Sequence, residues 1–87
     1  TVGSLAPDRP GVYGLYQDGQ TIYFGSSKTS IRDRLRSHLA GLEGPCTRSA
    51  SHVNWELSTT PVERERQLLL EFQSLYGRLP RCNNVVP

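Results

Sequence analysis

The stretch that decides the fold is PGVYGLYQDGQTIYFG, residues 10–25. Two β-rich segments, residues 11–16 and 21–25, flank a polar tetrapeptide at 17–20 that contains Asp18-Gly19. An Asp-Gly pair between alternating apolar and polar residues is a strong signal for a β-hairpin. The sequence therefore predicts that the first two strands pair in antiparallel orientation.

The register of this hairpin decides where Tyr13 and Tyr23 lie. A two-residue Asp18-Gly19 turn would pair residues whose numbers sum to 37 and would place the tyrosines on opposite faces. A three-residue loop with Gly19 in the left-handed conformation shifts the sum to 36 and places Tyr13 directly across from Tyr23. We predict the three-residue loop. The opposite face would then contribute four core residues: Val12, Tyr16, Ile22 and Phe24.

A helix and a third strand follow the hairpin. Ser30 is placed as an N-cap before Asp33, and an apolar residue recurs after 4, 4 and 3 positions from 31 to 42, the spacing of an amphipathic helix. Residues 43–51 contain glycine, proline and hydroxyl residues and predict a loop. Residues 52–57 alternate in polarity and predict a half-buried strand with Trp55 in the core.

A second helix is predicted from residue 61 to Tyr76. Thr60 and Glu63 have the spacing of a capping box around a proline, and Gly77 follows as a stop signal. Residues 1–10 predict an extended lead-in, and the short tail could add one more strand. The predicted fold class is α+β: a small central antiparallel sheet of about three strands flanked by helices, in the order β-β-α-β-α, within a single domain spanning residues 1–87.

Composition limits the classes of protein. A chain of 87 residues forms one core but not two. Cys46 and Cys82 form no CxxC pair, so zinc and redox motifs are absent, and a reducing compartment is the default with one disulfide left open. No apolar run approaches about 18 residues and no signal-peptide pattern opens the chain. We expect a cytoplasmic domain that does not bind a membrane.

The positive charge is clustered. The net charge is only +2, yet residues 28–38 contain four basic residues and one acid, and residues 76–87 contain two basic residues and no acid. Such clustering is typical of a polyanion partner, and a solvated helix face is the alternative reading. The basic residues in question, apart from Arg34, are Lys28, Arg32, Arg36, Arg78 and Arg81.

Five short motifs together resemble a known nuclease family. They are Pro10-Gly11-Val12-Tyr13, Tyr23-Phe24-Gly25, Arg34-Leu35, Leu69-Leu70-Glu71 and Pro80-Arg81-Cys82-Asn83. Their order and spacing resemble the GIY-YIG nucleases across residues 7–83, and most of all the N-terminal incision domain of the bacterial excision repair nuclease. The Arg34 and His38 spacing is similar to that of GIY-YIG restriction and structure-specific enzymes, where the repair domain tends to carry tyrosine.

The resemblance implies a metal-dependent phosphodiesterase site. One Mg²⁺ or Mn²⁺ ion would be held by Glu71, because Mg²⁺ needs few protein carboxylates when substrate phosphate supplies ligands. On a helical wheel Glu71 lies at the edge of the apolar arc and Glu65 nearer its centre, so the wheel alone does not select Glu71. Arg34 would bind the scissile phosphate through its planar guanidinium.

The other motif residues would handle water and protons. Tyr13 would be the general base or orient the attacking water, and a base role requires cationic neighbours that favour the phenolate. Tyr23 would share this work or bind phosphate, and His38, one turn beyond Arg34, would transfer a proton or bond phosphate. Asn83 would fix the active-site loop or pin the chain end, and Cys82 is interpreted as a packing residue.

The sequence thus predicts a divalent-metal-dependent DNA endonuclease. The five basic residues of the two clusters would contact DNA, and an attached or separate domain would choose the target. The alternative is a catalytically inactive nucleic-acid-binding module, which would bind DNA with a salt-dependent affinity that does not need Glu71.

Overall fold

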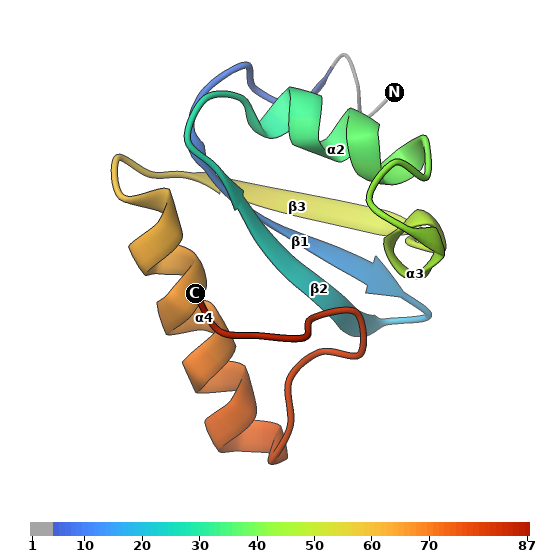
Figure 1. The fold of residues 1–87 in the computed structure, drawn as a ribbon, viewed down its shortest axis with the longest axis vertical. Helices are drawn as coiled ribbons and strands as arrows, with labels where there is room; N and C mark the ends of the chain where they lie inside the picture. Colours follow the sequence, from blue (N-terminus) through green and yellow to red (C-terminus); the bar gives the residue numbers. More distant parts are fainter. Residues whose placement is uncertain (1–4) are drawn as a thin grey trace.

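A computed structural model describes residues 5–87 and has an α+β fold, so the predicted class is confirmed. The elements are β1 (Gly11–Gln17), β2 (Gln20–Ser27), α2 (Ile31–Leu39), α3 (Pro45–Arg48), β3 (His52–Leu57) and α4 (Pro61–Tyr76). The three strands form one antiparallel sheet in the order β2-β1-β3. Figure 1 shows α2 and α4 on different sides of the sheet, with α3 at one end of it. Residues 1–4 of the predicted lead-in lie outside the described residues.

The hairpin register differs from the prediction. Asp18 and Gly19 form a two-residue turn with φ of 53° and 76°, as a right-twisted hairpin requires, so the predicted three-residue loop is wrong. The pairs nearest the turn sum to 37, and a bulge opposite the step from Leu15 to Tyr16, where Ile22 of β2 has no partner, raises the sum to 38 farther along the strands. Tyr13 is therefore paired with Gly25. Tyr23 lies two positions before Gly25 and so points to the same face of the sheet as Tyr13.

The two faces of the sheet pack against different helices. The cluster on the α2 side consists of Ala6, Tyr13, Leu15, Ile22, Ile31 and Leu35. Ile22 belongs to this cluster and not to the opposite face as predicted, since the bulge reorients it. On the α4 side the rings of Phe24 and Phe72 meet edge to face with centroids 6.2 Å apart, beside fully buried Leu69.

The helix ends follow the sequence signals in part. The Ser30 side chain accepts a hydrogen bond from the Asp33 amide at 3.2 Å, which confirms the first N-cap. Thr60 makes no side-chain cap bond, so the predicted capping box is wrong, and Pro61 at the first position begins α4 without it. Helix α4 ends at Gly77, whose φ of 72° is the left-handed stop that glycine favours.

The third strand is more exposed than its alternation suggests. Trp55 is 37% exposed and Leu57 is 55% exposed, which contradicts the prediction of Trp55 as a core residue. The reason is that β3 is an edge strand paired with β1, while α4 packs on β1 and β2. The predicted loop at 43–51 contains the single turn α3.

The C-terminal segment after α4 forms no strand but lies along the free edge of β2 (Figure 1). The Cys82 amide donates to the Ile22 carbonyl at 2.9 Å. Cys82 also forms a disulfide with Cys46, which realises the option that the sequence left open and ties this segment to α3. No helix in residues 5–87 is long and apolar enough to cross a membrane.

Candidate active site

Three aromatic side chains from three elements meet on the α2 side of the sheet. Tyr13 on β1, Tyr23 on β2 and His38 on α2 have ring centroids 5.0 to 6.3 Å apart. These are three of the six residues that the sequence singled out for catalysis, and they come together although the predicted register was wrong.

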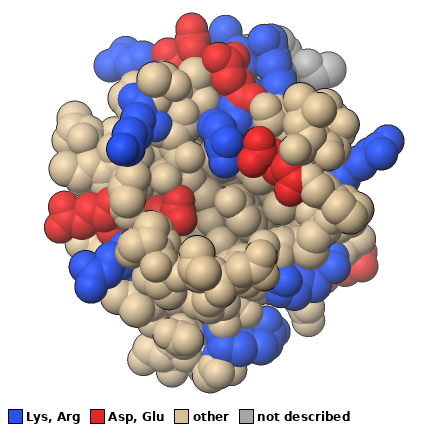
Figure 2. Space-filling model, in the orientation of Figure 1, with Lys and Arg blue, Asp and Glu red and all other residues tan. Residues whose placement is uncertain are grey.

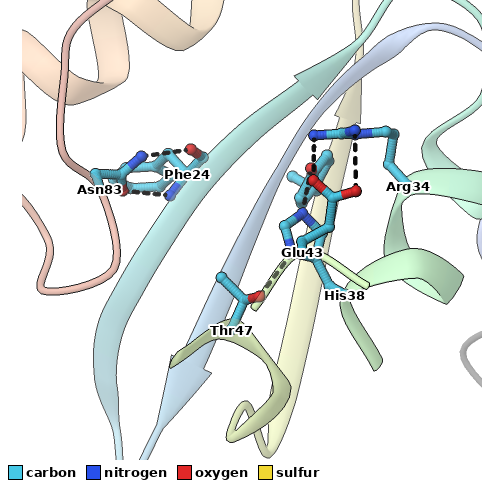
Figure 3. A network of polar contacts seen from close by, with 7 residues as sticks. Phe24, Arg34, His38, Glu43, Thr47 and Asn83 are labelled. Carbon is cyan, nitrogen blue, oxygen red and sulfur yellow. Dashed lines mark hydrogen bonds and ion pairs between the residues drawn. The ribbon is translucent and has the colours of Figure 1, made fainter. Parts of the chain in front are cut away.

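A chain of hydrogen bonds runs inward from this cluster. The Tyr13 hydroxyl lies 2.8 Å from Nε2 of His38, and Nδ1 of the same ring lies 2.8 Å from Oγ1 of Thr47 on α3 (Figure 3). Tyr13 and His38 are each 1% exposed and Thr47 is 3% exposed. Both ring nitrogens of His38 therefore already have hydrogen-bond partners within the protein.

A missing side chain makes room for Tyr13. A Cβ at Gly25, the residue paired with Tyr13, would lie 2.5 Å from both Cζ and the hydroxyl oxygen of Tyr13, and 2.7 Å from Cε2 of Tyr23. Gly25 has no positive φ, so it is space and not backbone conformation that requires glycine here. The tripeptide Tyr23-Phe24-Gly25 thus supplies one ring and the gap into which the other fits.

Burial controls the charge of these groups. Burial, and then the nearby Arg34 guanidinium, lower the pKa of His38 to about 4, so the ring is neutral at pH 7. Burial also raises the pKa of Tyr13, and the opposing effect of Arg34 is smaller. Burial and then the Glu65 carboxylate raise the pKa of Tyr23. A standing phenolate is therefore not available at neutral pH.

Arg34 borders the cluster from α2. Its guanidinium forms an ion pair with Glu43, with Nη2 3.3 Å from Oε1 (Figure 3), and its charge acts on Tyr13, Tyr23 and His38. Among the described residues, its Nε is the one buried side-chain nitrogen or oxygen without a hydrogen-bond partner. A buried donor without a partner is unfavourable unless a ligand satisfies it.

The α4 glutamate that interacts with the cluster is not the one in the predicted motif. Glu65 on α4 is half-buried and interacts electrostatically with Arg34 and both tyrosines. Burial raises its pKa. Glu71 is exposed and borders a small apolar pocket of about 80 Å³ beside Phe24 and Phe72.

Asn83 holds the C-terminal segment against β2. Its side-chain amide bonds both backbone groups of Phe24: Oδ1 accepts from the amide at 3.0 Å and Nδ2 donates to the carbonyl at 3.0 Å (Figure 3). The edge strand that carries Tyr23 is thereby fixed next to the site.

The basic residues chosen for DNA contacts do not form one track. Arg32 donates from Nε to the Ala6 carbonyl, and Arg81 bonds Gln17 and Ser49 at the hairpin end. Arg78 lies over the Phe72 ring. Lys28 and Arg36 are exposed near and on α2. Figure 2 shows one face of the molecule, on which basic and acidic side chains alternate around a centre of uncharged residues.

Sequence reasoning missed two residues of the site, Thr47 and Glu43. Both lie in or next to a stretch interpreted as a loop, where no periodicity identifies an inward-facing side chain. Sequence spacing cannot show that α3 brings Thr47 under His38.

Comparisons with known proteins show which proteins this chain is similar to. A family model described as "Domain of unknown function (DUF7508)" matches residues 1–74. The UvrABC system protein C of Moorella thermoacetica is 39% identical over 80 residues, which is 88% of this chain but 13% of that protein. The chain therefore spans about one eighth of the length of this curated relative.

Solved structures of one domain share the fold. The GIY-YIG N-terminal endonuclease domain of UvrC from Thermotoga maritima, bound to magnesium as its catalytic divalent cation, is 25% identical with a TM-score of 0.61. The match covers 92% of this chain and 89% of that one. An asparagine-to-alanine mutant of the same domain has a TM-score of 0.65 at 25% identity, covering 93% and 89%.

Proposed function

Because the chain belongs to the family described as "Domain of unknown function (DUF7508)" and has the GIY-YIG fold, we propose that it is a metal-dependent DNA endonuclease module. The observation that carries the proposal is the meeting of Tyr13, Tyr23 and His38 beside the buried, unpartnered Nε of Arg34. The magnesium-bound endonuclease domain of the Thermotoga maritima protein supports the divalent cation and the reaction.

Arg34 binds the scissile phosphate in this proposal. A phosphate oxygen would satisfy the buried Nε, and a planar guanidinium can donate two parallel bonds to such a group. Glu43 holds the other side of the guanidinium at 3.3 Å and so fixes its orientation.

Tyr13 and His38 move the proton. The attacking water gives a proton to the Tyr13 oxygen while the Tyr13 hydroxyl gives its own to Nε2 of His38, 2.8 Å away. Tyr13 then never carries a full negative charge, which agrees with a raised phenol pKa. Tyr23, which is less buried than Tyr13, contacts the phosphate or the same water.

The metal ligand is a glutamate of α4, and two are candidates. The described residues contain no group of three or more His, Cys, Asp or Glu side chains suited to a metal ion, but Mg²⁺ can bind through one carboxylate and substrate phosphate. The motif favours Glu71, as the sequence predicts, whereas the electrostatic interactions with Arg34 and both tyrosines favour Glu65. When bound, the ion stabilises charge on the phosphoryl oxygens.

Target choice belongs to another domain or partner. The chain matches 13% of its curated UvrC relative, which leaves room in that protein for other domains. The scattered and internally bonded arginines of this chain supply at most general contacts to the DNA backbone.

A cleavage assay tests the proposal. Plasmid, flapped and branched DNA would be incubated with the protein in Mg²⁺, Mn²⁺ or EDTA, and Arg34→Ala, Glu65→Gln and Glu71→Gln would be compared with Glu63→Gln, which changes an exposed glutamate of the same helix. We expect metal-dependent cleavage that Arg34→Ala lowers about 10²–10³-fold. The glutamate substitution that abolishes both cleavage and Mn²⁺ binding, measured by paramagnetic resonance, identifies the ligand.

Two results would contradict the proposal. Cleavage that persists in EDTA and in Arg34→Ala would indicate a contaminating nuclease. DNA binding that depends on salt and not on either glutamate, with no cleavage of any substrate in the presence of a target-recognition domain, would support the inactive binding module instead.

A further inference from the structure

The His38 ring is held from both sides, yet a neutral imidazole has only one N–H. Its partners are two hydroxyl groups, Tyr13 at Nε2 and Thr47 at Nδ1, each 2.8 Å away. A hydroxyl can donate or accept, so the distances alone allow two arrangements with opposite proton directions. Only one of them leaves Nε2 free to take a proton.

The proposed proton transfer is possible in only one of the two arrangements. Tyr13 can give its hydroxyl hydrogen to Nε2 of His38 only if that nitrogen is unprotonated, and Nδ1 then carries the ring hydrogen and donates it to Thr47. In the opposite arrangement Thr47 donates to Nδ1, and Nε2 carries the ring hydrogen and donates it to Tyr13.

We propose that Thr47 is a positioning residue that holds His38 in the Nδ1–H tautomer, so that Nε2 can accept the proton of Tyr13. The proposal rests on the proposed nuclease function, whose proton transfer requires an unprotonated Nε2, but the tautomer can be measured without cleavage. Thr47 belongs to none of the five sequence motifs, since it lies between the Arg34-Leu35 motif and β3.

The surroundings of Thr47 suit this role. Its side chain is buried, so water does not compete for Nδ1, and the hydrogen bond that one ring nitrogen makes sets the tautomer at the other. Helix α3 is one turn long and begins at Pro45. Cys46, the residue before Thr47, anchors this helix through its disulfide with Cys82. This short helix therefore places one hydroxyl beneath the ring.

The remaining charged and titratable neighbours leave the ring neutral. Arg34 opposes protonation of His38 and Glu43 favours it, and burial has a larger effect than either. Tyr23 packs against the ring with centroids 5.0 Å apart and contributes no standing charge at neutral pH. The tautomer and not the charge is thus what Thr47 controls.

The test is a nitrogen NMR measurement on the intact protein at pH 7. Long-range ¹H–¹⁵N correlation separates protonated from unprotonated ring nitrogens, and His38→Gln distinguishes the His38 signals from those of His52. Thr47→Val removes the hydroxyl at nearly constant volume, Thr47→Ser keeps it, and Thr59→Val removes an exposed hydroxyl as a control.

We expect Nδ1–H in the native protein, in Thr47→Ser and in Thr59→Val, and a mixture of tautomers in Thr47→Val. Cleavage in Thr47→Val should fall at least about 10²-fold in kcat with KM unchanged, and Thr47→Ser should restore it. An Nε2–H tautomer in the native protein would overturn the proposal, as would an unchanged tautomer in Thr47→Val. If the tautomer responds as expected but the native protein cuts no DNA, the positioning role stands and the nuclease function fails.

Discussion

Replacing Gly25 by alanine tests how closely the two tyrosines are fitted. The new Cβ would lie 2.5 Å from Cζ and the hydroxyl oxygen of Tyr13, whereas carbon atoms pack best at about 3.5–4.0 Å. The Tyr13 ring would therefore have to move by about 1 Å, away from a position that is buried and bonded to His38. Crowding of this kind in a packed core costs about 1–3 kcal/mol.

The same displacement should impair catalysis in molecules that remain folded. A misplacement of about 1 Å can cost about 10² in rate, and here it falls on the bond between the Tyr13 hydroxyl and His38. Urea denaturation would give the stability change. Cleavage rates, corrected for the folded fraction, would give the catalytic change.

Gly14→Ala is the matched control, because Gly14 lies on the same hairpin. Its Cβ would meet Asn54 Oδ1 at 2.8 Å and the Tyr16 hydroxyl at 2.9 Å, both at the ends of side chains that can move. We expect a change within about 0.5 kcal/mol and nearly native cleavage. Equal stability and equal activity of Gly25→Ala and Gly14→Ala would refute the reasoning.

Three further predictions concern charge and covalent structure. Arg34→Lys keeps the charge but loses the buried Nε and the planar pair of donors, so the cleavage rate should fall about 10²–10³-fold. Lys28→Ala, at an exposed site, is the control and should have little effect on cleavage. Equal cleavage rates in the two variants would refute a phosphate role for Arg34. Because the pKa of His38 is lowered to about 4, the unfolded chain binds its proton first, and stability should fall as the pH drops from about 6.5 toward 4; urea titrations across this range should show a weaker dependence in His38→Gln. Reduction of the Cys46–Cys82 disulfide, which spans 36 positions, should lower the free energy of unfolding by up to about 4 kcal/mol, and an unchanged melting temperature in reducing agent would contradict this.

Local sequence signals were enough for the order of the three strands and of α2 and α4, but not for the short helix α3. The Ser30 cap and the Gly77 stop each act on the backbone nearby, so a sequence shows them directly. The Asp18-Gly19 pair marked the hairpin, but the length of its loop was predicted wrongly. Trp55 was misjudged because alternation on a strand says which residues share a face but not whether anything covers that face.

The site was predictable only in its motif residues. Tyr13 and Tyr23 share a face, as predicted, but through a bulge opposite the step from Leu15 to Tyr16 that no turn signal reveals. The motif favoured Glu71, whereas the helical wheel placed Glu65 nearer the centre of the apolar arc, and in the structure it is Glu65 that interacts electrostatically with both tyrosines. The position of Thr47 next to His38 depends on tertiary contacts alone, so no sequence pattern predicts it.

The segment that Asn83 and Cys82 hold along β2 also bears on aggregation. An edge strand with open amides and carbonyls is a template on which another chain can add a strand. Here the Cys82 amide donates a hydrogen bond to the Ile22 carbonyl, and the Asn83 side chain forms hydrogen bonds with both backbone groups of Phe24. Loss of this segment would leave these three backbone groups of β2 without hydrogen-bond partners, on a strand rich in β-branched and aromatic residues. We therefore expect a chain truncated before this segment to self-associate in solution.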